Sequence, residues 1–143
     1  MRLSKYSDYS LRVMMHAALR QPALATIDEV AGAFGISRNH LVKVVHALGQ
    51  NGFLSTRRGI GGGFTLALPP SKIGIGHLVR LTESDDRVID CKNARNQPCQ
   101  ILPVCRLKGV LGEAASAFFA VLDRYSLEDL VKQKSEMRNL LGI

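Results

Sequence analysis

Hydrophobic residues recur at steps of three and four over residues 4–50, the spacing that places them on one face of a helix. The first stripe predicts a helix over residues 4–20, with Ser4 or Ser7 as its cap and Pro22 at its end. A second, shorter helix is expected from the capping box at residues 26–29. The chain therefore opens with helices, and its strands come later.

A third helix is predicted to begin at the cap Ser37 and to stop at residues 51–52. Only a short turn containing Gly35 separates it from the second helix, which is the pattern of a helix-turn-helix. Residues 53–56 and 64–68 are expected as two strands around a basic, glycine-rich hairpin tip. A helix-turn-helix followed by such a hairpin predicts a winged helix.

The pattern changes twice in the second half of the chain. A helix capped by Ser71 is expected over residues 73–81, and periodicity is then lost over residues 84–103. Loops of this length inside compact domains are usually functional or disordered. From about Val104 to Tyr125, apolar residues return at the spacing of a coiled coil, which requires a partner helix.

The expected fold class is mainly α with a small β-hairpin wing, a winged helix-turn-helix followed by a long dimerisation helix. We assign residues 1–82 to the winged helix, 83–103 to a cysteine-containing loop, and 104–143 to the dimerisation helix and C-terminal tail. Residues 126–129 are expected to cap one more short helix. The tail from Lys132 onward is polar until Leu140 and Leu141.

Composition narrows the possible functions. The 143 residues suffice for one domain, or for a small domain with an oligomerisation arm. The net charge of +7 suits a polyanionic partner such as nucleic acid. The N-terminus does not resemble a secretory signal and no apolar run approaches about 18 residues, so a cytoplasmic protein without a membrane span is expected.

Polar residues on the third helix have the donors that DNA recognition requires. Arginine pairs with guanine, asparagine with adenine, and serine or a helix N-terminus binds phosphate. A solvated polar face is the alternative, but the position between a helix turn and a basic wing favours DNA. The wing arginines are expected to reach phosphates or the minor groove, while the glycines beside them are also typical of a flexible hairpin end. The predicted DNA contacts are Ser37, Arg38, Asn39, His40, Lys43, Arg57, Arg58 and Gly59.

The three cysteines, Cys91, Cys99 and Cys105, lie together in the polar loop with the spacing C-x7-C-x5-C. Three thiols cannot pair off within one chain, and idle thiols are the alternative to ligands. Basic neighbours such as Lys92 and Arg106 favour the thiolate form. Zinc usually binds closely spaced cysteine pairs, which are absent here, so the wide gaps favour an iron–sulfur cluster that lacks one ligand.

Together these residues resemble the Rrf-type family of winged-helix iron–sulfur transcription regulators, and within it most closely the nitric-oxide-sensing repressors. The resemblance covers nearly the whole chain, and its motifs are specific in combination. It rests on the N-terminal Met-Arg-Leu, on residues 8–12, 37–43, 58–59 and 62–63 with Leu66, on the three cysteines with residues 105–108, and on residues 127–131.

The resemblance implies a homodimer whose long helices cross, with each cysteine loop near the other subunit's first helix. It also implies that an aspartate early in that helix completes the cluster from across the dimer, and the matching residue is Asp8. Competing candidates are Asp85, Asp86, Asp90, His77, a water or a small ligand. The ordinary explanation of Asp8 is a charge favoured by the helix dipole. The histidines are otherwise expected as core, cap or phosphate-contact residues.

The expected function is that of a dimeric DNA-binding repressor, and not an enzyme. Its cluster, four-iron in preference to two-iron, is expected to sense nitric oxide and, when damaged, to release palindromic double-stranded operator DNA. Sensing of iron or of cluster supply is the second hypothesis. An electron-transfer or redox enzyme and a non-DNA interaction module are further alternatives, and the absence of substrate and cofactor motifs argues against the enzyme.

Overall fold

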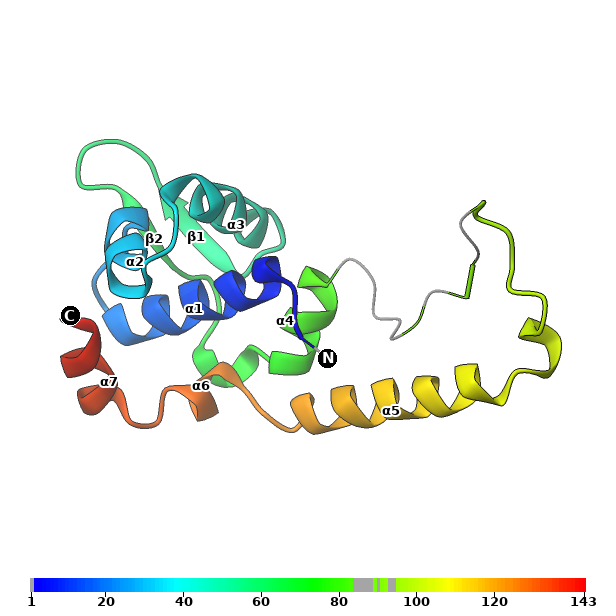
Figure 1. The fold of residues 1–143 in the computed structure, drawn as a ribbon. Helices are drawn as coiled ribbons and strands as arrows, with labels where there is room; N and C mark the ends of the chain where they lie inside the picture. Colours follow the sequence, from blue (N-terminus) through cyan, green and yellow to red (C-terminus); the bar gives the residue numbers. More distant parts are fainter. Residues whose placement is uncertain (1, 84–88, 90, 93–94) are drawn as a thin grey trace.

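The computed structural model describes residues 2–83, 89, 91–92 and 95–143, and shows a winged helix from which one long helix extends as an arm (Figure 1). This confirms the expected fold class, mainly helical with a two-stranded hairpin. No helix in the described ranges is long and apolar enough to cross a membrane. The elements are, in order, α1 (Lys5–Arg20), α2 (Ile27–Phe34), α3 (Arg38–Gln50), β1 (Leu54–Arg57), β2 (Gly63–Leu66), the 3-10 helix η1 (Pro70–Lys72), α4 (Ile75–Thr82), the 3-10 helix η2 (Leu102–Val104), α5 (Arg106–Leu122), α6 (Leu127–Leu130) and α7 (Lys134–Leu141).

Local sequence determines where the first three helices begin and end. The Ser4 hydroxyl caps α1, accepting a hydrogen bond from the backbone of its first turn. Thr26 and Glu29 form both halves of the predicted capping box, with bonds of 2.8 and 3.2 Å. Gly35 ends α2 in the left-handed region, with φ of 62°. Ser37 is the N-cap residue of α3, as predicted, although its hydroxyl makes no capping bond.

The helix boundaries in the second half differ from the predicted ones. Ser71 lies inside η1, and α4 begins only at Ile75, after Gly74. The reason is tertiary: Ile75 N–H donates to the Tyr125 carbonyl at 2.9 Å, which holds this segment extended against the chain that precedes α6. The long helix α5 begins two residues later than expected because η2 occupies the preceding turn.

The C-terminal helix α7 was not predicted, and a long-range contact holds it in place. Arg138 donates from Nε to the carbonyl of Leu19 at 2.7 Å and from Nη2 to that of Gln21 at 3.2 Å. These carbonyls lie at the C-terminal end of α1, where a cation is also favoured by the helix dipole. The tail therefore packs back onto the first helix.

The wing is tied to the helical body by a short third segment. Leu54 of β1 lies opposite Leu66 of β2, and both are buried. On the other side of β2, Phe64 and Ala25 exchange two backbone hydrogen bonds of 2.8 and 2.9 Å. The wing is thus anchored to the connection between α1 and α2. The core beneath it includes Val13, Met14, Ala17, Leu41, Val44, Leu48, Phe64, Leu78 and Val79.

His16 is a core residue, which is one of the three roles (core, cap or phosphate contact) expected for the histidines. It is fully buried on α1 and meets the ring of Phe34 edge-on, with centroids 6.3 Å apart. Neither ring nitrogen has a hydrogen-bond partner among the described residues. Burial lowers the pKa of His16, while Glu29 raises it and Arg20 lowers it to smaller extents.

We expect His16→Leu to remove part of the pH dependence of folding. Because the fold favours neutral His16, the wild-type free energy of unfolding should fall as the pH drops below about 6.5, by at most about 1.4 kcal/mol per pH unit for this group. The variant loses this contribution. Urea denaturation at several pH values between 7.5 and 5 measures it, with the exposed His46→Leu on α3 as the control. Parallel curves for wild type and His16→Leu would contradict the prediction.

Candidate functional site

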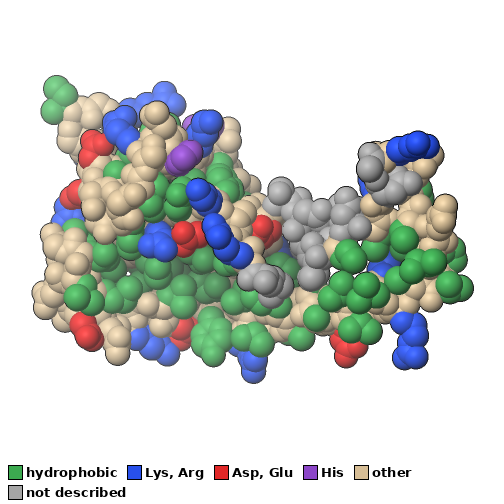
Figure 2. Space-filling view, in the orientation of Figure 1, with side chains coloured by type: hydrophobic (Ala, Val, Ile, Leu, Met, Phe, Trp, Pro, Cys, Tyr) green, Lys and Arg blue, Asp and Glu red, His purple; other side chains and the backbone are tan. Residues whose placement is uncertain are grey.

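The predicted DNA contacts are all exposed, and they come from the N-cap and first turns of α3, from the last residue of β1 and from the loop that follows it. Arg38, Arg57, Arg58 and Gly59 line one groove of about 710 Å³ between the helix-turn-helix and the wing. Basic side chains gather over this end of the molecule (Figure 2). The fold therefore brings the predicted helix residues and the predicted wing residues to a common surface.

Arg38 has a partner that the sequence did not predict. Its Nε lies 2.7 Å from Oδ1 of Asp28 on α2, and both side chains are more than half exposed. Exposed pairs of this kind contribute at most about 1 kcal/mol, so a phosphate or a base can replace the carboxylate at little cost. Asp28 thus holds the Arg38 guanidinium at the start of α3.

His40 connects α3, the helix expected to read DNA, to α1. Its ring centroid lies 6.0 Å from that of Tyr9, the residue that follows Asp8. Tyr9 was not predicted as a functional residue, because no sequence pattern relates two aromatic rings so far apart in the chain. The start of α1 is therefore in contact with the helix expected to read DNA.

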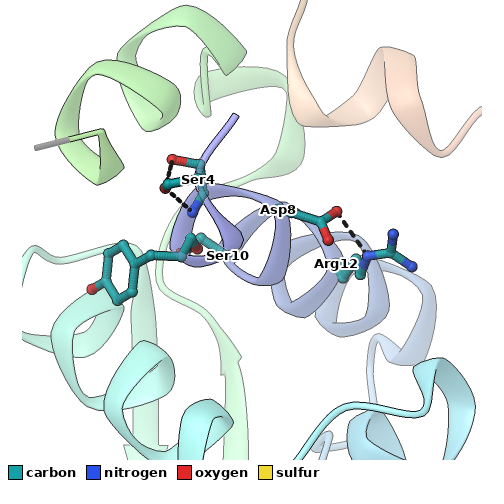
Figure 3. Close-up of polar contacts among 6 residues, drawn as sticks. Ser4, Asp8, Ser10 and Arg12 are labelled. Carbon is teal, nitrogen blue, oxygen red and sulfur yellow. Dashed lines mark hydrogen bonds and ion pairs between the residues drawn. The ribbon is translucent and has the colours of Figure 1, made fainter. Parts of the chain in front are cut away.

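Asp8 lies in the first turn of α1, where its Oδ1 accepts a hydrogen bond of 2.8 Å from Arg12 Nε (Figure 3). Its side chain remains 44% exposed. The guanidinium of Arg12 lies 5.4 Å from the ring centre of Phe34, at the end of α2. Asp8 thus has an ordinary helix-terminal partner in its own chain and is still accessible to a second one.

The start of the cysteine loop is fastened to the same end of α1. Glu83, which follows α4, accepts a hydrogen bond of 2.8 Å from the backbone N–H of Ser4. Next to it, the buried Thr82 hydroxyl donates to the Ser7 hydroxyl at 2.9 Å. The loop therefore leaves the body beside the turn that carries Asp8.

Backbone hydrogen bonds order the described part of the cysteine loop. The N–H of Cys99 donates to the carbonyl of Cys91 at 2.8 Å, and a bridge between Lys92 and Pro98 flanks this bond. Cys105 occupies the cap position of α5, directly after η2. All three are free thiols, and Cys91 and Cys105 are half-buried. Two of the three predicted ligands are thus neighbours across a short turn.

The chemistry of this donor set fits an iron–sulfur cluster, since such clusters are held by cysteine thiolates. The described part of one chain does not complete a site, because no three His, Cys, Asp or Glu side chains within it could hold a metal ion. Among the competing fourth ligands, His77 is exposed on α4 with its ring 5.7 Å from that of Phe53. Asp85, Asp86 and Asp90 lie outside the described residues.

Comparisons with known proteins identify the family. The family model Rrf2, described as "Iron-dependent Transcriptional regulator", matches residues 3–133. The chain belongs to the Rrf2 family. The resemblance noted in the sequence is therefore confirmed.

Curated relatives align with this chain over nearly its whole length. The HTH-type transcriptional regulator NsrR of Bacillus subtilis (strain 168) is 48% identical over 142 residues, which cover 99% of this chain and 97% of that protein. The NsrR of Oceanobacillus iheyensis is 44% identical and covers 100% of this chain and 98% of its own length. This chain is thus similar to transcriptional regulators of the same length.

Solved structures support the fold. IscR from T. potens superposes with a TM-score of 0.73 at 22% identity, covering 93% of this chain and 88% of that one. CymR, the global cysteine regulator of B. subtilis, superposes with a TM-score of 0.66 at 23% identity, covering 93% of this chain and 98% of that one. At these identities the likeness concerns the Rrf2 fold alone.

In this Rrf2-family chain, an ion pair connects α4 to the C-terminal end of α5, and the sequence did not predict it. Arg80 donates two hydrogen bonds, of 2.6 and 2.7 Å, to the two carboxylate oxygens of Asp123, and they lower the pKa of that carboxyl. The guanidinium also lies 4.5 Å from the ring centre of Phe119. A side chain at Gly76 would overlap Asp123. The C-terminal end of α5 is therefore fixed to the winged helix.

The remainder of α5 exposes the predicted apolar stripe. That stripe consists of Leu107, Leu111, Ala114, Phe118, Val121 and Tyr125. Phe119 is the only buried residue of α5, and within the stripe Leu107 is 52% and Val121 43% exposed, whereas Leu111 and Phe118 are half-buried. Hydrophobic side chains extend along this arm in the space-filling view (Figure 2). Such a stripe on a helix outside the core marks an interaction surface. Phe118 packs partly against the core, whereas Leu107, Ala114 and Val121 remain exposed.

Proposed function

We propose that this Rrf2-family chain is a homodimeric repressor whose iron–sulfur cluster senses nitric oxide and controls binding to a palindromic operator. The observation that carries the proposal is the fastening of the cysteine loop to the end of α1 that bears Asp8, through Thr82 and Glu83. Through Tyr9, the same end of α1 contacts the recognition helix. The relatives named NsrR support the assignment.

The exposed apolar stripe of α5 is the surface through which two subunits form the dimer. Its spacing is that of a coiled coil, so the same stripe of another copy is its natural complement. Dimerisation related by a two-fold axis places two α3 helices in successive major grooves, about one helical turn of DNA apart. Arg38 and Asn39 at the start of α3 then face base edges, and Arg57 and Arg58 contact the backbone or the minor groove.

Cys91, Cys99 and Cys105 would hold the cluster, a four-iron cluster in preference to a two-iron one, and Asp8 of the partner subunit would provide the remaining ligand. When bound, the cluster would supply iron that reacts with nitric oxide, and the Asp8 carboxylate would be a harder and weaker ligand for it than the three thiolates.

Asp8 couples the cysteine loop of one subunit to the DNA-binding helix-turn-helix of the other. If its carboxylate lies in the partner's loop, it is withdrawn from Arg12, whose guanidinium rests on Phe34 of α2. The adjacent Tyr9 contacts His40 of α3. A change of partner at Asp8 therefore alters contacts with both helices of the helix-turn-helix. It thereby alters the distance between the helix-turn-helix units of the two subunits.

Asp8→Ala tests this proposal. We expect the anaerobically reconstituted variant to have a changed cluster absorbance and circular dichroism spectrum, or a changed response of operator binding to nitric oxide. The apo-dimer should persist in size-exclusion chromatography, because Asp8 lies outside α5. Glu136→Ala, which removes another acidic residue from the first turn of a helix, is the matched control. If the spectrum and the response of Asp8→Ala both match wild type, Asp8 is not the ligand.

The family description "Iron-dependent" supports a second candidate function, the sensing of iron or of cluster supply. The two functions differ in the signal. Titration of the reconstituted dimer with nitric oxide and, separately, with an iron chelator distinguishes them when operator binding is followed. Release only by nitric oxide favours the first function, and release by chelator alone favours the second. Iron and sulfide counts per chain establish the type of cluster.

A further inference from the structure

The tip of the wing carries an isoleucine that no described part of the chain covers. Ile60 has a relative exposure of 108%, the highest among the large exposed hydrophobic side chains of the described residues. Single exposed apolar residues are ordinary on protein surfaces, so exposure alone has no functional meaning. The position of Ile60 and the geometry that presents it are what distinguish it.

A tight turn holds Ile60 at the outermost point of the wing. Gly62 N–H donates to the Gly59 carbonyl at 2.9 Å and closes a four-residue turn with Ile60 in its second position. Gly61, in the third position, has φ of 71°, which is typical of a type II turn. A side chain at Gly62 would overlap the carbonyl of Arg57. The turn is therefore closely packed, and a β-branched side chain with few rotamers projects from it.

The surroundings of Ile60 are basic. Arg57 and Arg58 precede it, are exposed, and line the groove shared with α3. An apolar tip beside arginines matches the minor groove of DNA, where cationic side chains bind the phosphate walls and apolar wedges contact base steps. A protein partner would instead require a wider apolar patch, and the neighbours of Ile60 along the chain are glycines.

We propose that Ile60 is a minor-groove wedge that inserts against a base step of the operator and bends the DNA under each wing. The proposal rests on the proposed function, because it requires that this surface bind operator DNA. The wedge predicts a preference for particular DNA sequences that arises from how easily the DNA deforms and not from hydrogen bonds to bases. Flexible pyrimidine–purine steps are easily unstacked, so such a step is preferred under the wing.

The test compares Ile60→Ala, Ile60→Phe and Leu140→Ala, the last removing another exposed apolar side chain on α7, away from the wing. The probe is a duplex that the wild-type holoprotein selects from a random-sequence pool. It carries end-to-end fluorophores that report bending and 2-aminopurine at the step under the wing. Ile60→Ala should bind about 5- to 30-fold more weakly, with less bending and less 2-aminopurine fluorescence. Ile60→Phe should retain both signals, and Leu140→Ala should match wild type.

The outcomes separate this inference from the proposed function. If Ile60→Ala binds, bends and unstacks the duplex as wild type does, the wedge is wrong, while operator binding stands. Weaker binding with unchanged bending and fluorescence also overturns the wedge, because it describes a contact that does not deform DNA. If the wild-type holoprotein selects no duplex from the pool, the proposed function itself fails.

Discussion

Ala114→Glu should convert the protein to monomers and remove most of its affinity for the operator. Ala114 is exposed in the middle of the apolar stripe of α5, so the substitution places a carboxylate at the expected centre of the dimer interface. Burying an unpaired charge is far more costly than burying alanine, and two such charges would face each other across the two-fold axis. Without the dimer, the two half-sites are bound independently, which lowers the apparent affinity by about 10²- to 10⁴-fold.

Sedimentation velocity and mobility-shift titration measure the two effects on the same preparation. Asn139→Asp adds one negative charge on the exposed face of α7 and controls for the change in net charge. Both variants should have a wild-type circular dichroism spectrum, because neither residue belongs to the core. A dimer of Ala114→Glu at micromolar concentration, with wild-type operator affinity, would show that α5 is not the interface.

The winged helix could be predicted from the sequence because its signals are local. The Thr26–Glu29 capping box and the turn at Gly35 determine the ends of α2 within a few residues, and the structure contains both. The strands of the wing follow from two short strand-forming segments on either side of a glycine-rich tip, and the structure pairs them as an antiparallel hairpin. Each of these features depends on residues close together in the chain, so a single sequence reveals them.

The contacts that connect these elements could not be predicted in the same way. Asp28 with Arg38, Tyr9 with His40, and Arg80 with Asp123 join residues that no periodicity relates. The helix α7 is a similar case, because its position depends on carbonyls of α1 that only the folded chain brings near Arg138. Long-range packing decides such details, and it also moved the start of α4 away from Ser71.

The cysteine loop lies between these two cases. Residue type and basic neighbours predict thiolate ligands, and the structure orders Cys91 and Cys99 by a backbone hydrogen bond. The fourth ligand is not determined by the sequence of one chain, because the resemblance assigns it to another subunit. Asp8 has a partner of its own in Arg12, so its ligand role remains a prediction that the spectra of Asp8→Ala decide.

The glycines of the wing show how structure changes an interpretation of the sequence. A flexible hairpin end explains them equally well in the sequence, but a side chain at Gly63 would overlap the carbonyl of Ala25 and crowd Leu24. Gly63 begins β2 next to the two hydrogen bonds that join Phe64 to Ala25. The residue is therefore required by close packing between the wing and the connection from α1 to α2.

Gly63→Ala should consequently lower the free energy of unfolding by about 1–3 kcal/mol, the usual cost of overpacking, and the melting temperature by roughly 3–10 °C. It should also weaken operator binding, because relief of the overlap moves β2 away from Ala25 and carries Arg57 and Arg58 with it. Thermal denaturation followed by circular dichroism measures the first effect. Gly32→Ala is the matched control, since its added methyl meets no atom within 4 Å and should raise stability by about 0.5–1 kcal/mol through helix propensity. Equal melting temperatures for Gly63→Ala and wild type would mean that the wing yields to the methyl group, and the anchoring contact at Ala25 would then not be what positions the wing arginines.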